Sequence, residues 1–137
     1  MNKLIIHIDG GARGNPGPAA IGVVITPPAG GKTYQERIGN TTNNVAEYKA
    51  AVFALKKAKQ LLGKEKSKSE IEVRTDSELL YKQLNAQYKI KNKELQPLFI
   101  EIWNLQQDFK KVKFIHIARE ENREADRLVN QALDTLF

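Results

Sequence analysis

The sequence predicts an α/β fold in which helices flank a five-stranded mixed sheet. Its apolar patterns follow one another in the order β-β-β-α-β-α-α-β-α. Short connections join the first three strands and make them antiparallel, whereas helices separate the later strands and make the last two parallel. With 137 residues and 41% hydrophobic content, the chain fits a single domain over residues 1–137.

Continuous or alternating apolar residues locate the strands. We predict them at residues 3–9, 20–26, 32–38, 71–75 and 112–117. In the third strand polar and apolar side chains alternate, which is typical of a partly exposed edge strand. Pro27-Pro28 and Gly30-Gly31 predict the turn that precedes it.

Helical periodicity and capping residues locate the helices. We predict them at residues 45–62, 76–86, 94–109 and 122–137. The cluster at residues 40–44 (Asn-Thr-Thr-Asn-Asn) supplies capping side chains before the first helix, and Gly63 ends that helix. Residues 63–70 and 88–93 are polar and rich in lysine, which predicts surface loops.

Composition excludes several kinds of site. The chain has no cysteine, so it offers no disulfide, no thiolate nucleophile and no cysteine ligand for zinc. No apolar run approaches the roughly 20 residues of a membrane span, and the first residues show no signal-peptide pattern, so we expect a cytoplasmic protein without a membrane partner. A net charge of +6 favours a polyanionic partner such as nucleic acid without deciding it.

Four acids lie at junctions between the predicted elements. Asp9 ends the first strand and opens a glycine-rich segment, and Asp76 follows the fourth strand. Glu47 and Asp126 each lie near the start of a helix, on its apolar stripe. Any one of them could be a turn or capping residue. Together they would repel one another at one end of the sheet unless a hard cation such as Mg²⁺ or Mn²⁺ neutralised them.

Three sequence blocks carry a resemblance to a known family. They are Asp9-Gly-Gly-Ala-Arg-Gly-Asn-Pro-Gly-Pro-Ala, Thr41-Thr-Asn-Asn-Val-Ala-Glu47, and Thr75-Asp-Ser77 followed by His116-Ile-Ala-Arg-Glu-Glu-Asn-Arg-Glu-Ala-Asp126. In this order and spacing the chain resembles a type 1 ribonuclease H, from Asp9 to the last helix. Because residues 88–95 pass directly into one helix, it resembles the minimal form that lacks a basic protrusion.

The resemblance implies the ribonuclease H fold and hydrolysis of the RNA strand of an RNA/DNA hybrid. It implies 3′-hydroxyl and 5′-phosphate ends and little base-sequence specificity. It assigns the catalytic and metal-binding roles to Asp9, Glu47, Asp76 and Asp126. Two Mg²⁺ (or Mn²⁺) ions held by these carboxylates would activate a water and stabilise the leaving 3′ oxygen, with Asp9 as the bridging ligand.

The resemblance also implies substrate-binding residues. A loop from Gly10 to Asn15 would read RNA 2′-hydroxyls through its backbone. Asn15 and Thr42 would form part of a pocket for a DNA-strand phosphate, and Asn43 and Asn44 would reach into the minor groove, even where residues 41–44 also cap a helix. The full predicted set is Gly10, Gly11, Arg13, Gly14, Asn15, Thr42, Asn43, Asn44, Ser77 and Arg119. Possible accessory residues are His116 and Asn122, with Arg119 favoured over His116 for a role at the phosphate or in product release.

Two other interpretations stay open. A nucleic-acid-binding module of the same fold that does not cleave would satisfy the basic charge, although it would not need four acids. Another nuclease of the two-metal superfamily would share the acids, although the blocks at residues 14–17 and 41–44 point away from it. For the preferred interpretation we expect a monomer whose partner is an RNA/DNA hybrid.

Overall fold

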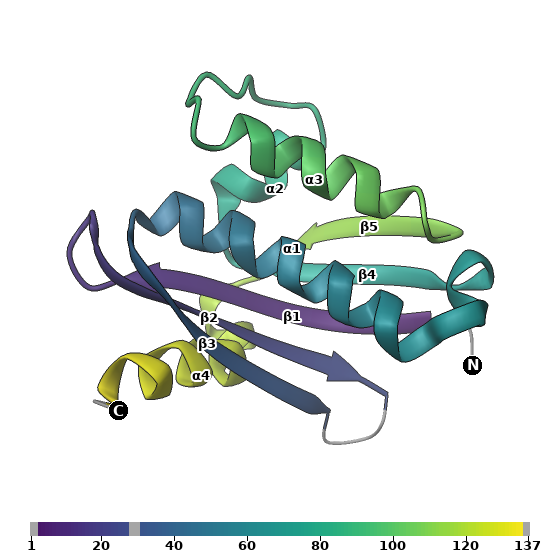
Figure 1. The fold of residues 1–137 in the computed structure, drawn as a ribbon, viewed down its shortest axis with the longest axis horizontal. Coiled ribbons are helices and arrows are strands. Elements are labelled where there is room, and N and C mark those ends of the chain that lie inside the picture. The colour runs from purple at the N-terminus through teal and green to yellow at the C-terminus, as the bar shows by residue number, and fades with distance from the viewer. Residues whose placement is uncertain (1–2, 28–30, 136–137) are drawn as a thin grey trace.

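A five-stranded sheet forms the centre of the computed structural model, which describes residues 3–27 and 31–135. The strands lie in the order β3-β2-β1-β4-β5 (Figure 1). Their bounds are β1 Lys3–Ala12, β2 Gly17–Thr26, β3 Lys32–Thr41, β4 Glu70–Thr75 and β5 Lys111–His116. The predicted edge position of the third strand is confirmed. The predicted turn at residues 28–30 lies outside the described residues.

The sheet is mixed, as predicted. Antiparallel pairing joins β1 to β2 and β2 to β3, and parallel pairing joins β1 to β4 and β4 to β5. In the parallel register Ile8 lies opposite Thr75. The next residue on each chain is an acid, so this register brings Asp9 and Asp76 to neighbouring positions.

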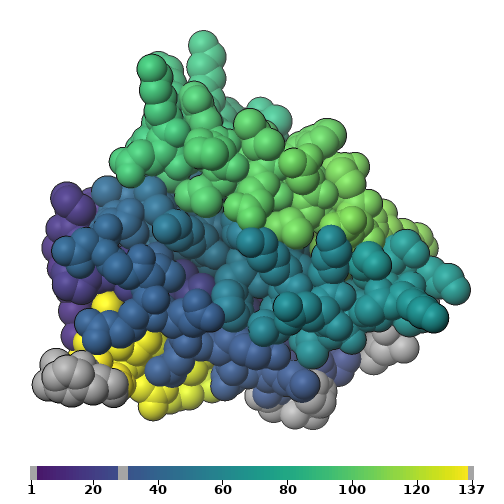
Figure 2. Space-filling model, in the orientation of Figure 1, coloured from purple at the N-terminus to yellow at the C-terminus, as the bar shows by residue number. Residues whose placement is uncertain are grey.

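Helices cover both faces of the sheet. Their bounds are α1 Asn43–Leu62, α2 Glu78–Leu84, α3 Gln96–Gln106 and α4 Arg123–Asp134, with short 3₁₀ helices at Gly63–Lys68 and Arg119–Asn122. α1 packs on β1 and β2, and α3 lies against α1 (Figures 1 and 2). α4 packs on β1, β2 and β3 from the opposite face. In the described part of the chain, no helix combines the length and the apolar character that crossing a membrane requires.

The apolar core lies mainly between the sheet and α1. Fully buried Ile6 and Ile8 of β1 meet Leu55 of α1 there, which agrees with the predicted apolar stripes. A smaller cluster under α4 is formed by Ala20, Val129, Ala132 and Leu133. The apolar cluster that attaches α4 to the sheet is therefore small. α4 can approach the strands closely only where the strand residues that face it have small side chains or none.

The structure corrects several predicted boundaries. β1 continues to Ala12, so Asp9 lies inside a strand and the predicted loop from Gly10 is wrong; Gly10 and Gly11 continue the ladder opposite Ile21 and Ala20. α1 begins two residues earlier than predicted, which moves Glu47 from the first turn into the second.

Three predicted helices begin later than expected, and one of them, α3, runs from Gln96 to Gln106 where residues 94–109 were predicted. α2 begins at Glu78 because the Ser77 hydroxyl accepts a hydrogen bond from Leu80 N (3.2 Å). The last helix begins at Arg123 after a 3₁₀ turn, and its predicted end at residues 136–137 lies outside the described residues. The predicted loop at residues 63–70 is largely the 3₁₀ helix Gly63–Lys68.

Two glycines let helices approach the sheet closely, one on each face. A Cβ at Gly10 would overlap the Ala46 carbonyl of α1 and lie 2.6 Å from Glu47 N. A Cβ at Gly22 would overlap the Ala125 carbonyl of α4 and lie 2.9 Å from Leu128 Cβ. The helices that carry Glu47 and Asp126 therefore sit at a distance from the strands that only glycine permits.

We expect Gly22→Ala to lower the free energy of unfolding by about 1–3 kcal/mol, because overpacking forces α4 away from β2. Gly11→Ala is the matched control, since its Cβ would meet only Val129 Cγ1, at an ordinary 3.6 Å. Urea denaturation followed by circular dichroism measures both. Equal stability of the two variants would contradict the spacer role of Gly22.

Candidate active site

A cavity of about 420 Å³ opens where β1, α1, α4 and the residue after β4 meet. All four predicted catalytic acids line it. The lining residues are Asp9, Gly10, Gly11, Ala12, Arg13, Asn43, Glu47, Asp76, Arg119, Asp126, Val129, Asn130 and Leu133. Backbone glycines, cationic side chains and carboxylates thus surround one space.

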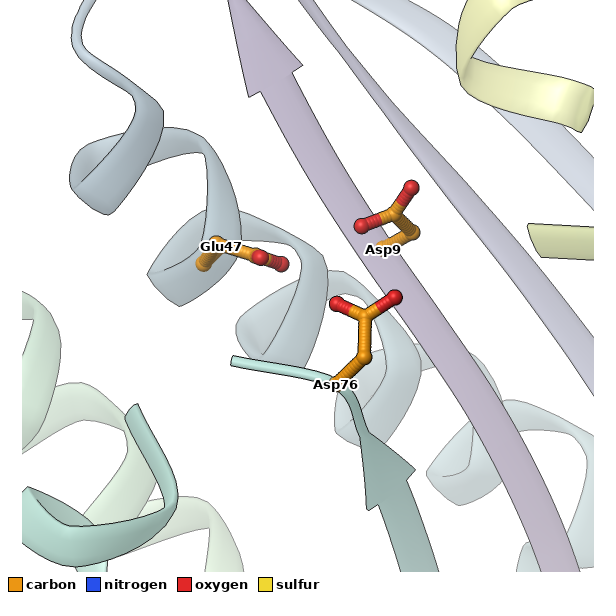
Figure 3. A group of neighbouring side chains, drawn as sticks. All are labelled: Asp9, Glu47 and Asp76. Carbon is orange, nitrogen blue, oxygen red and sulfur yellow. The ribbon is translucent and has the colours of Figure 1, made fainter. Parts of the chain in front are cut away.

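Three carboxylates form the centre of the cavity. Asp9 projects from β1, Glu47 from α1 and Asp76 from the residue that follows β4, and the three side chains point toward one another (Figure 3). Each offers an oxygen, and these oxygens lie within 4.8 Å of one another. Close grouping of hard oxygen donors suits a divalent cation such as Mg²⁺ or Mn²⁺. The residues present therefore fit the predicted metal.

The backbone of β1 holds Glu47 in this group. Gly10 N donates a hydrogen bond to Glu47 Oε1 over 2.9 Å. The same glycine leaves the space that lets α1 approach, so it both admits Glu47 and orients it. Because its amide is engaged in this way and the residue is buried, Gly10 belongs to the carboxylate site more than to a surface that reads RNA.

Asp126 lies in the first turn of α4 and lines the same cavity. It is not one of the three acids whose oxygens lie within 4.8 Å of one another. The prediction that all four acids gather is therefore met by a close group of three and a fourth carboxylate on the α4 side of the cavity.

Burial and mutual repulsion raise the pKa values of the grouped acids. Asp9 is 8% exposed, and its burial, with the charges of Asp76 and Asp126, raises its pKa to about 8. Burial, followed by the charge of Asp9, raises the pKa of Glu47 well above its usual value. The grouped acids therefore hold protons more tightly than free Asp or Glu, and a bound cation would displace those protons.

Asp76 lies beside groups that favour its charged form. Burial raises its pKa, while a hydrogen bond from Asn122 and the charge of Arg119 oppose that rise. The Asn122 bond runs from Nδ2 to Asp76 Oδ2 over 3.4 Å. Asp76 is thus held between neighbouring carboxylates and two groups that favour its charged form.

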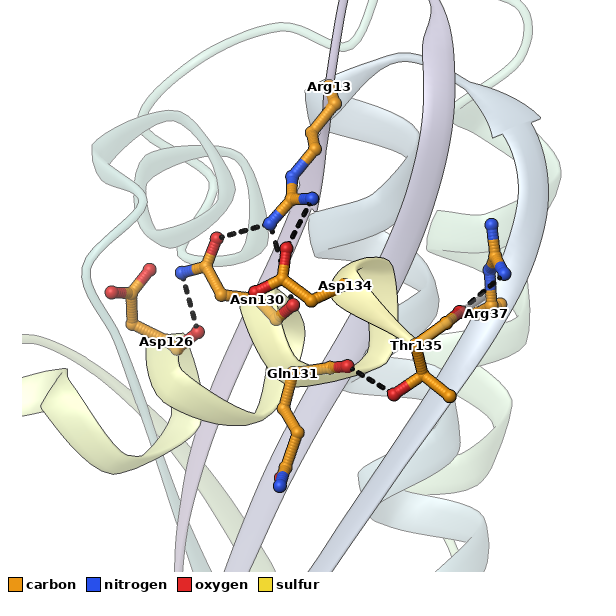
Figure 4. A network of polar contacts seen from close by, with 7 residues as sticks. All are labelled: Arg13, Arg37, Asp126, Asn130, Gln131, Asp134 and Thr135. Carbon is orange, nitrogen blue, oxygen red and sulfur yellow. Dashed lines mark hydrogen bonds and ion pairs between the residues drawn. The ribbon is translucent and has the colours of Figure 1, made fainter. Parts of the chain in front are cut away.

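Arg13, a predicted substrate-binding residue, is engaged by α4 (Figure 4). It forms an ion pair with Asp134 Oδ1 (2.6 Å) and donates to the backbone and side-chain oxygens of Asn130 at 3.5 and 3.4 Å. Asn130 in turn donates to the Asp126 backbone carbonyl over 3.1 Å. Arg13 lines the cavity, yet its guanidinium ties the β1–β2 turn to α4.

A second network ties the same turn to α1. Asn15 Oδ1 accepts from Asn43 N (3.0 Å), and Asn43 Oδ1 accepts from Ala12 N (2.8 Å). Asn43 is exposed at the rim of the cavity, and neither bond engages its side-chain Nδ2. Gly14, with φ of 93°, supplies the left-handed residue that the turn requires.

Several other predicted substrate residues act as caps or lie at the periphery. Thr42 Oγ1 caps α1 by accepting from Val45 N (3.2 Å), and Ser77 caps α2. Asn44 is exposed in the first turn of α1. These three do not line the cavity described above. The capping alternative therefore holds for Thr42 and Ser77.

Arg119 and His116 differ in their relation to the acids. Arg119 lines the cavity, and its charge lowers the pKa values of both Asp76 and Glu47. His116 ends β5, is exposed, and stacks on Tyr81 with ring centroids 5.7 Å apart. Of the two, Arg119 faces the carboxylates more directly.

Sequence reasoning missed the contribution of α4 to the cavity wall. Val129, Asn130 and Leu133 line it and were not predicted as site residues. Asn130 follows Asp126 by one helical turn, so the i, i+4 spacing could have indicated it. Asp134, which pairs with Arg13, carries no comparable signal because an exposed acid at a helix end is common.

Comparisons with known proteins find similar sequences over nearly the whole chain. A family described as "Reverse transcriptase-like" matches residues 7–132. Ribonuclease HI of Halobacterium salinarum is 37% identical over 134 residues, covering 96% of this chain and 65% of that protein. The bifunctional protein Rv2228c of Mycobacterium tuberculosis is 36% identical over 135 residues, and the chain spans only 36% of its length.

Solved structures are similar over nearly the whole chain. The crystal structure of LC11-RNase H1 in complex with RNA/DNA hybrid gives a TM-score of 0.89 at 46% identity, covering 96% of both chains. RNase H1 from Halobacterium salinarum gives a TM-score of 0.86 at 36% identity, covering 96% of this chain and 98% of that one. The fold, the order of the sequence blocks and these matches agree: the chain belongs to the type 1 ribonuclease H family.

Proposed function

We propose that the protein is an endoribonuclease that hydrolyses the RNA strand of RNA/DNA hybrids and leaves 3′-hydroxyl and 5′-phosphate ends. The observation that carries this proposal is the group formed by Asp9, Glu47 and Asp76, whose oxygens lie within 4.8 Å of one another. Asp126 lines the same cavity. The hybrid bound by a similar protein, LC11-RNase H1, supports the choice of substrate.

The four carboxylates, Asp9, Glu47, Asp76 and Asp126, would hold two Mg²⁺ or Mn²⁺ ions. When bound, such ions supply a nucleophilic water and stabilise the charge that develops on the leaving oxygen. The protein's own groups position these ligands: Gly10 N holds Glu47, and Asn122 holds Asp76. Arg119 contributes positive charge beside the acids, where a scissile phosphate would enter.

Substrate contacts would come from the rim of the cavity. Gly11 lies in β1 and lines the cavity without a side chain, so a nucleic-acid backbone can approach it closely. The side-chain Nδ2 of the exposed Asn43 can donate a hydrogen bond to sugar or base edges in a minor groove. Contacts of this kind position a duplex and recognise sugar type, which is consistent with little base-sequence specificity.

Other parts of the assignment stay predictions. They are the choice between Mg²⁺ and Mn²⁺, a single domain over residues 1–137, the monomeric state and the cytoplasmic location. Of the two competing interpretations, a binding module that does not cleave is disfavoured by the raised pKa values of the buried acids, because such groups cluster at reactive sites.

We expect Asp9→Asn to reduce cleavage of a labelled RNA/DNA hybrid by more than about 100-fold, since even outer-shell partners of metal ligands contribute 10–100-fold. Gel analysis of wild type and variant, with Mg²⁺, Mn²⁺ or EDTA, measures this loss. RNA duplex, DNA duplex and single strands serve as substrate controls. Wild type that binds the hybrid but never cuts it would support the binding module instead.

We expect the metal-free protein to lose thermal stability as pH rises from about 4 to about 8. Asp9 has a pKa of about 8 when folded and of about 3.9 when unfolded, so the folded state holds the extra proton in this range and loses that advantage as pH rises. Differential scanning calorimetry in EDTA measures Tm at pH 5 and pH 8.

The same experiment tests the metal. Millimolar Mg²⁺ or Mn²⁺ should raise Tm more at pH 8 than at pH 5, because fewer protons must then be displaced. Asp9→Asn should flatten the pH dependence and reduce the metal effect. A wild-type Tm that does not respond to either ion at pH 8 would count against the metal assignment.

We expect Gly11→Val to weaken hybrid binding by about tenfold, equivalent to about 1.4 kcal/mol, because the added side chain occupies the space where the backbone of the duplex would lie. Fluorescence anisotropy of a labelled hybrid in Ca²⁺ measures the affinity. Gly11→Ala, whose Cβ fits, should have a smaller effect. Hybrid affinity unchanged by Gly11→Val would refute the close approach.

A further inference from the structure

Asn122 is among the most completely buried polar side chains that the structure describes. It is 1% exposed and lies at the junction between the 3₁₀ helix Arg119–Asn122 and α4. A buried amide of this kind normally has partners for both its donor and its acceptor. In Asn122 the amide nitrogen has hydrogen-bond partners, whereas the amide oxygen has none in the described structure.

The amide nitrogen connects two elements of the carboxylate site. Asn122 Nδ2 donates to the backbone carbonyl of Ile8 over 2.8 Å and to Asp76 Oδ2 over 3.4 Å. Ile8 directly precedes Asp9. Because both partners are acceptors, they also fix the orientation of the amide, with nitrogen toward the acids.

The chain connection adds a third acid. Asn122 lies four residues before Asp126, at the point where α4 begins. The Asn122 side chain is thus linked to three acids. It bonds Asp76 directly, it bonds the carbonyl of the residue before Asp9, and it lies at the start of the helix that carries Asp126.

The amide oxygen has no such role. Asn122 Oδ1 is buried and has no hydrogen-bond partner in the described structure. A buried acceptor without a partner lowers stability. The residue therefore contributes less to folding than a fully bonded amide would, while its donor acts directly on a carboxylate that its neighbours repel.

We propose that Asn122 is a positioning residue for the metal site: its amide holds Asp76 turned toward Asp9 and Glu47, and sets the start of α4 against β1. This inference rests on the proposed function. It requires that Asp76 be a metal ligand, and it predicts that metal affinity depends on a side chain that is not itself a ligand.

The test is calorimetric binding of Mn²⁺ to the free protein, without nucleic acid. We expect Asn122→Ala to weaken Mn²⁺ binding by about 10–100-fold, the range for loss of an outer-shell partner. Asn122→Asp keeps the shape but removes the donor, and its added charge should weaken binding or shift the stoichiometry.

Gln83→Ala is the matched control. Gln83 is also a buried amide, 6% exposed, that donates to Lys89 O (3.1 Å) and accepts from Tyr48 OH (2.6 Å), and it does not line the cavity of the acids. Its loss should lower Tm without changing Mn²⁺ affinity. If Asn122→Ala and Asn122→Asp behave in the same way as Gln83→Ala, the positioning role is overturned. Failure of both Asn122 variants to fold, even in saturating Mn²⁺, while Gln83→Ala folds, would also overturn it.

The outcomes separate this inference from the proposed function. If wild type cleaves no hybrid but Asn122→Ala still weakens Mn²⁺ binding relative to Gln83→Ala, the positioning role stands and the function fails. If wild type cleaves the hybrid and Mn²⁺ binds the Asn122 variants with unchanged affinity, only the positioning role fails.

Discussion

Repulsion between carboxylates is the constraint on which the rest of the site depends. The oxygens of Asp9, Glu47 and Asp76 lie within 4.8 Å of one another, and burial first, then the charges of neighbouring carboxylates, raise the pKa values of these acids. Such a group persists only where the surrounding structure forces it. The parallel register of β1 and β4 places two of the acids side by side, and the packing of α1 on Gly10 brings the third.

A few hydrogen-bond donors and one cationic side chain stabilise the carboxylates against that repulsion. Gly10 N donates a hydrogen bond to Glu47 and Asn122 donates one to Asp76. Arg119 adds positive charge beside both acids. None of these groups neutralises the site completely. The protein therefore keeps a group of carboxyl oxygens that a divalent cation can bind by displacing their protons, and these oxygens already lie close together.

The architecture and the four acids could be predicted from the sequence because they depend on local patterns. Glu47 and Asp126 are acids on otherwise apolar helix stripes, which made them candidate site residues, and both line the cavity. Contacts between distant segments could not be predicted. The pairing of Arg13 with Asp134 and the occupied amide of Gly10 depend on how α4 and α1 dock on the sheet, and the strand through Gly10–Ala12 was hidden by glycines that usually indicate turns.

The hydrogen bond from Gly10 to Glu47 has a consequence for observing this protein. The Gly10 amide proton is shielded by the second turn of α1 and is held by a carboxylate of the site. Its chemical shift and exchange rate therefore report directly on whether Glu47 is seated. A single backbone resonance can follow the integrity of this carboxylate group in solution, in the absence of nucleic acid and without labelling any of its side chains.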